Sequence, residues 1–131
     1  MKIEVSNGEI IDKYTILEIK LSEIKDTKKL VNVKHEYEVL TPIVEQIYAE
    51  AANQETLKKL HNNLLEINKT LWKIEDDIRE CERAKDFGET FIKLARAVYY
   101  TNDDRSVVKK EINEFTGSDL VEEKSYEDYK D

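Results

Sequence analysis

The side chains best suited to chemistry lie between residues 96 and 113. They combine cations, amides, a phenol and a carboxylate around a predicted interruption between two helices. Groups of these types at a helix end commonly form a site for a small anion or a sugar-like molecule. They also suit helix capping and i,i+4 ion pairs, so a purely structural interpretation stands beside the functional one. The candidates are Arg96, Tyr99, Asn102, Asp103, Arg105, Lys109 and Asn113.

Catalytic and metal-binding patterns are weak elsewhere in the chain. His35, His61 and Cys81 lack the spacing of metal ligands, which favours surface histidines and a small buried cysteine. Cys81 falls at an inward-facing helical position, where a thiol behaves as an inert apolar group. We therefore expect no metal, no cofactor and no catalytic residue, which favours a binding or assembly protein over an enzyme.

Composition narrows the range of partners. The 131 residues include 21 Lys and Arg against 29 Asp and Glu, a formal net charge of -8. A surface of this sign repels a phosphate backbone, so we expect no nucleic-acid partner. No apolar run approaches the roughly 20 residues that span a bilayer, and no signal peptide opens the chain, so we expect no membrane association. The single cysteine predicts a cytoplasmic protein, in the host cytoplasm if a phage encodes it.

Apolar residues between positions 57 and 81 recur at alternating gaps of three and four, which is the a/d rhythm of a coiled coil. This pattern predicts one long helix that ends near Asp86–Gly88 and buries a continuous seam against a neighbour. The seam residues are Leu57, Leu60, Leu64, Ile67, Leu71, Ile74, Ile78 and Cys81.

Two helices are predicted before the long one. Residues 2–6 form a short extended strap or an edge strand, and Ser6 or Asn7 caps a helix with a wide apolar face that runs to about Lys25. The next helix starts after Asp26–Thr27, and its seam continues to Ala51. Pro42 predicts a kink near residues 38–42 or, alternatively, two helices that meet there. We expect this second helix to form an antiparallel hairpin with the long helix, whose cap is Asn53.

After the long helix, the pattern predicts helices over 89–100 and 104–115, separated by a break at 101–103. The predicted fold is therefore all-α: an elongated antiparallel helical bundle built on a long helix hairpin, with two shorter C-terminal helices. Residues 1–117 form the bundle domain, and residues 118–131 form an acidic tail. This tail is either disordered or lies along the bundle through Leu120, Val121 and its tyrosines.

Several motifs resemble a small family of bacterial and phage proteins known only as a domain of unknown function. The first is GEIIDK at 8–13, followed by TILEIK at 15–20, and the last is EEKSY at 122–126. The sequence departs from the family at Thr27, where we expect a helix-opening proline. The other matching residues are Leu71, Trp72, Ile74, Glu75 and Asp76; Asp86, Phe87 and Gly88; Leu94, Ala95, Arg96, Val98 and Tyr99; Thr101, Asn102 and Asp103; Lys109, Ile112 and Asn113.

The resemblance implies no activity, but it adds Asp12 and Lys13 to the candidate site residues. Together with Arg96, Asn102 and Asp103, they form either a shared polar site or a buried network that docks the first helix on the C-terminal helices. The expected function is a non-enzymatic protein-interaction or assembly module that forms a homo-oligomer, a dimer above all, or binds a protein partner. The alternative is a protein that binds or modifies a small anionic or sugar-like ligand through the cluster at 96–113.

Overall fold

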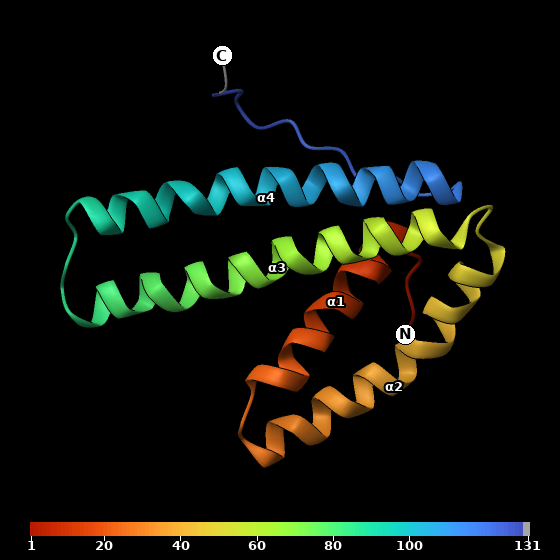
Figure 1. Ribbon diagram of the computed structural model, residues 1–131, viewed down its shortest axis with the longest axis horizontal. Coiled ribbons are helices and arrows are strands. Elements are labelled where there is room, and N and C mark those ends of the chain that lie inside the picture. The colour runs from red at the N-terminus through yellow and green to blue at the C-terminus, as the bar shows by residue number, and fades with distance from the viewer. Residues whose placement is uncertain (130–131) are drawn as a thin grey trace.

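Side-chain caps determine where three of the four helices begin. Oγ of Ser6 accepts a hydrogen bond from the amide of Glu9, the Asp26 carboxylate accepts from two amides, and Oδ1 of Asn53 accepts from the amide of Thr56. The computed structural model describes residues 1–129, and Figure 1 shows its four helices. They are α1 (Asn7–Glu23), α2 (Thr27–Glu50), α3 (Gln54–Arg83) and α4 (Glu89–Thr116). The described residues contain no strand, which confirms the all-α prediction and leaves residues 1–6 as an extended segment.

The seam predicted on the long helix is buried or half-buried at every position. Leu57 and Leu64 are fully enclosed, and Ile74 and Cys81 continue the buried face toward the far end of α3. Ile11 of α1 and Ile112 of α4 complete the core cluster. The apolar stripe of α3 therefore meets the other helices along its length.

The pairing of helices differs from the prediction. The long hairpin is present, but α3 pairs with α4, whereas α2 and α3 contact each other little. In Figure 1, α1 lies between α2 and α3, and the α1–α2 pair diverges from the α3–α4 pair. The predicted hairpin of α2 with α3 is wrong because the wide apolar face of α1 contacts α2, α3 and α4 and so keeps α2 away from α3.

The predicted pair of short C-terminal helices is also wrong, since α4 is one continuous helix. The residues at 101–103 have modest helix propensity, but none of them is proline, and tertiary packing overrides such preferences. Thr101 and Arg105 also fall on the same face as the apolar positions before and after them. The seam of α4 thus runs without a phase change through Phe91, Leu94, Val98, Thr101, Arg105, Val108, Ile112 and Phe115.

A single helix also crosses Pro42, so the alternative of two helices meeting there is wrong. Figure 1 shows α2 changing direction along its length, in agreement with the predicted kink. No described helix has both the length and the apolar character that crossing a bilayer requires.

His61 corrects the expectation of surface histidines. It is buried at the junction of α1, α2 and α3, whereas His35 is exposed. Its Nδ1 is 2.9 Å from the hydroxyl of Tyr48, and its Nε2 is 2.9 Å from the carboxylate of Glu18. Both ring nitrogens are therefore satisfied by partners on the neighbouring helices, which makes burial of this polar ring possible.

Gly117 ends α4 in the left-handed conformation, and the chain then runs back over the helix (Figure 1). Ion pairs hold this C-terminal segment, residues 118–129: Lys109 with Glu122 at 3.5 Å, and Lys110 with Glu123 at 3.3 Å. The segment thus lies along the bundle, although Leu120 and Val121 remain exposed. Residues 130 and 131 of the predicted tail lie outside the described residues.

Candidate functional site

A buried polar network joins three helices next to the candidate residues. The carboxylate of Asp12, from α1, is enclosed and accepts a bidentate pair of hydrogen bonds from the Arg105 guanidinium of α4. It also accepts a bond of 2.9 Å from the amide of Asn68 on α3, which donates 2.8 Å away to the hydroxyl of Thr15. The hydrogen bonds to Asp12 raise the pKa of Arg105 above its ordinary value, against the opposing effect of burial. Arg105 is therefore a cation held in a fixed orientation.

A second group of contacts holds the start of α1 against α4. The backbone amide of Gly8 donates 2.6 Å to Oδ1 of the buried Asn113, and Nζ of Lys109 lies 2.7 Å from the Glu9 carboxylate. Burial lowers the pKa of Lys109, but the hydrogen bond to Glu9 and the surrounding carboxylates outweigh it, so the net shift is upward. These contacts satisfy the amino-terminal groups of α1 at a helix–helix junction.

The Glu9–Lys109 pair should make folding stability sensitive to acid. The hydrogen bond from Lys109 lowers the pKa of Glu9 from its ordinary value of 4.5 and outweighs the upward effect of burial. Because the pKa of Glu9 is lower in the folded state, the ion pair contributes its full stability at pH values above the pKa of the unfolded state. This contribution is lost as the pH falls through the pKa of the folded state. We expect the urea midpoint of Glu9→Gln to fall less than that of the unmodified protein between about pH 5 and pH 3. Glu4→Gln, at an exposed position, is the control. If the urea midpoint fell equally with pH in all three proteins, the Glu9–Lys109 pair would not be the source of the acid sensitivity.

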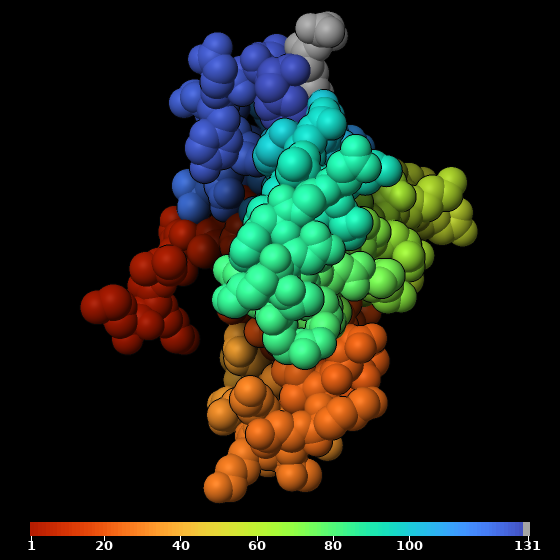
Figure 2. All heavy atoms as spheres, turned by 90° about the vertical axis from the view of Figure 1, so that its left-hand side faces the viewer, coloured from red at the N-terminus to blue at the C-terminus, as the bar shows by residue number. Residues whose placement is uncertain are grey.

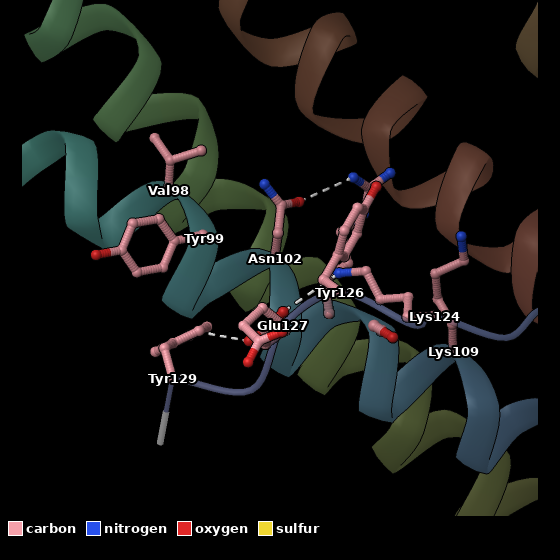
Figure 3. A pocket seen from close by; sticks show the side chains of 11 residues that line it. Val98, Tyr99, Asn102, Lys109, Lys124, Tyr126, Glu127 and Tyr129 are labelled. Carbon is pink, nitrogen blue, oxygen red and sulfur yellow. Dashed lines mark hydrogen bonds and ion pairs between the residues drawn. The ribbon is translucent and has the colours of Figure 1, made fainter. Parts of the chain in front are cut away.

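A cleft of 620 Å³ lies between α4 and the C-terminal segment. Figure 3 shows Tyr99 and Asn102 from α4 together with Tyr126 and Tyr129 from the C-terminal segment among the side chains that line it. Five of the nine candidate residues line it, and the other lining residues include Lys124 and Glu127. The five are Tyr99, Asn102, Asp103, Arg105 and Lys109.

Polar contacts tie the two walls of the cleft together. Lys124 lies 3.3 Å from the carboxylate of Asp103, and the hydroxyl of Tyr129 donates to the same carboxylate. Oδ1 of Asn102 accepts a bond of 3.3 Å from Arg105, so the fixed guanidinium forms part of the floor. Donors from the helix and from the C-terminal segment thus face one shared space (Figure 3).

Four candidate residues lie elsewhere. Asp12 and Asn113 are buried in contacts between α1 and α4, which fits the predicted alternative of a docking network. Lys13 is exposed and lies 3.2 Å from Glu36 of α2. Arg96 is exposed over the ring of Tyr100, 5.9 Å from its centroid, and does not converge with Asp12.

Sequence reasoning missed several residues of this region. Asn68 and Thr15 complete the buried network, and Ser106, Tyr126 and Glu127 line the cleft. Arg105 was among the predicted candidates, and its place at an apolar seam position also indicates a buried partner, which a cation at such a position requires. No comparable signal marks Asn68, because it follows Ile67 of the seam and a polar residue there is equally suited to solvent.

Comparison with known proteins gives a family but no activity. The model of a family of unknown function (DUF6165) matches residues 1–129. No curated protein and no solved structure matches the chain.

Proposed function

The chain belongs to this family of unknown function, DUF6165, and we propose that it binds a small anionic, hydroxyl-rich molecule of the sugar-phosphate or uronate type. The observation that carries the proposal is the cleft beside α4, where the fixed Arg105 meets tyrosine rings and amide and hydroxyl groups. Its volume of 620 Å³ lies within the range of small-molecule sites.

The cationic donors of the cleft are the groups that would contact an anion. Three cations, Arg105, Lys109 and Lys124, line it, and each is held in place by a carboxylate: Asp12, Glu9 and Asp103 respectively. The chain as a whole carries a net charge of -8, so three cations gathered on one cleft differ from the average surface.

The uncharged groups favour a ligand with many hydroxyls. The side chains of Asn102 and Ser106 offer an amide and a hydroxyl to the cleft. The exposed ring of Tyr99 provides an apolar face, and Tyr126 provides another from the C-terminal segment. Aromatic faces combined with amide and hydroxyl groups suit a molecule that is apolar on one side and polar at its edge.

A thermal-shift screen tests the proposal. Sugar phosphates, uronates, nucleotide sugars and inorganic phosphate are added in turn, and a ligand at about 100 times its Kd should stabilise the fold by about 2.7 kcal/mol. Tyr99→Ala and Lys124→Ala should each reduce this stabilisation, since each removes a partly exposed side chain from the lining of the cleft.

Arg96→Ala is the matched control, because it removes an exposed α4 cation that does not line the cleft. Its ligand-induced shift should equal that of the unmodified protein. A screen without a stabilising compound would count against the proposal, as would a shift that Lys124→Ala leaves unchanged.

We also infer that the chain serves in the cytoplasm as a non-enzymatic assembly module, as a dimer or with a protein partner. The supporting observation is the α1–α2 hairpin, which projects from the α3–α4 pair in Figure 2. The outer side of α2 carries exposed apolar residues, namely Val31, Val39 and Ile43. Exposed apolar side chains aligned on one helix commonly mark a surface that another protein covers. The single cysteine, Cys81, is free and buried, which suits a reducing compartment.

A further inference from the structure

One ridge of α2 faces away from the rest of the protein. The opposite side of the helix packs against the core through Val33, Val44 and Ile47. The residues of the outer ridge are exposed and follow one another at helical spacing, so they form one continuous line along α2. They are Lys28, Val31, His35, Val39, Ile43 and Gln46.

The charges beside this ridge run against the helix dipole. The first turn of α2 has no acidic residue and carries Lys28 and Lys29, while the last turn has no basic residue and ends at Glu50. Cations at a helix amino terminus and anions at its carboxyl terminus are unfavourable within a single helix. Within the described residues, Lys28, Lys29 and Glu45 have no ion pair that would offset this arrangement.

We propose that α2 pairs with α2 of a second copy in antiparallel orientation, about a two-fold axis level with Tyr37. This inference rests on the assembly role proposed above and specifies its surface and partner. The residue numbers of each facing pair then add up to 74, so each residue of the ridge faces a ridge residue of the second copy. Val31 faces Ile43 of the second copy, His35 faces Val39, and Lys28 faces Gln46.

Charge complementarity selects this partner and this orientation. In the same register Lys28, opposite Gln46, lies within about one helical turn of Glu45 and Glu50 of the second copy, and Lys29 lies on the same flank of the ridge as Glu50. The two-fold axis repeats each contact, so a distribution that is unfavourable in one helix becomes complementary in the pair. A parallel pairing would instead bring lysines against lysines.

The size of the ridge indicates a weak interaction. From Lys28 to Gln46 the helix rises about 27 Å, and one helix pair of that length gives an interface at the small end of the range for specific complexes. The dimer should therefore depend on protein concentration and on salt, because exposed ion pairs are screened.

Sedimentation equilibrium of the full chain at low and high salt tests the proposal through charge reversal. K28E/K29E and E45K/E50K should each lose the dimer, since each places like charges opposite one another. An equimolar mixture of these two variants should recover it as a heterodimer, and the chain carrying all four substitutions should recover it as a homodimer. K58E/K59E, which reverses two exposed lysines of α3, is the matched control and should leave the dimer unchanged.

Folding should not complicate these variants, because the substitutions lie at exposed positions and correct the charge at both ends of α2. Circular dichroism of each variant checks this. If the dimer dissociation constant stayed the same in the charge-reversal variants and in Val31→Asp, the α2 pairing would be wrong, although the protein would still self-associate. A strict monomer at every concentration and salt would overturn the α2 pairing and, with it, the proposed self-association.

Discussion

Asp12→Ala should lower the free energy of unfolding by about 3 kcal/mol, at the lower end of the range for breaking a buried ion pair. The substitution leaves the Arg105 guanidinium and the Asn68 amide without their shared acceptor. The Arg105 side chain keeps 29% of its exposure, so water compensates part of the loss, and this places the effect near 3 rather than 5 kcal/mol. Urea denaturation at neutral pH measures the change.

Lys13→Ala is the matched control for this prediction. Lys13 is the next residue on α1, and its ion pair with Glu36 is exposed, so its loss should change stability by less than about 1 kcal/mol. A double-mutant cycle of Asp12→Ala with Arg105→Ala should show a coupling free energy of at least about 1 kcal/mol. Additive effects of the two substitutions would show that the pair does not act as a unit.

Gly8→Ala should destabilise the protein by about 2 to 3 kcal/mol through overpacking. A Cβ at this position would lie 2.4 Å from the carbonyl oxygen of Lys109 and 2.9 Å from Oδ1 of Asn113. The first of these atoms belongs to the backbone of α4, so only a movement of one helix relative to the other can relieve the clash. That movement would also weaken the hydrogen bond from the Gly8 amide to Asn113. The expected loss outweighs the roughly 1 kcal/mol that alanine normally gains over glycine in a helix.

Gly88→Ala provides the comparison at a glycine without a close backbone neighbour. The nearest atom to its added Cβ is a side-chain oxygen of Asp86 at 3.3 Å, which can move. Its stability should stay within about 1 kcal/mol of the unmodified protein. Equal thermal stability of the two alanine variants would mean that α1 and α4 are not held together as closely as Gly8 indicates.

The Asp12→Ala and Gly8→Ala substitutions both probe the junction of α1 with α4. Asp12 fixes the Arg105 guanidinium, and Gly8 allows the start of α1 to approach the backbone of α4 beside Lys109. Because Arg105 and Lys109 also line the cleft, the docking of α1 determines how its cations are presented. The buried network and the open cleft are therefore two faces of one arrangement.

The sequence by itself determined three of the four helices and most of the helix ends. Caps such as Ser6, Asp26 and Asn53 act on amides within three residues, so their effect is visible locally. The seam of α3 is likewise a property of spacing along one helix, and its burial followed from that spacing. The concentration of cleft residues on α4 was visible for the same reason, since they lie within about three turns of one helix.

Only the tertiary structure decided which helices pair and what the polar residues contact. A seam specifies that a helix has a neighbour without specifying which one, so α4 rather than α2 could take the place beside α3. Arg105 resembled a residue at a helix break until its partner was located, and that partner, Asp12, is 93 positions away in the chain. His61 and Asn68 are buried because distant side chains supply their hydrogen bonds. The physical reason is that a polar group is stable inside a protein only when a partner reaches it, and that partner comes from the fold rather than from the neighbouring sequence.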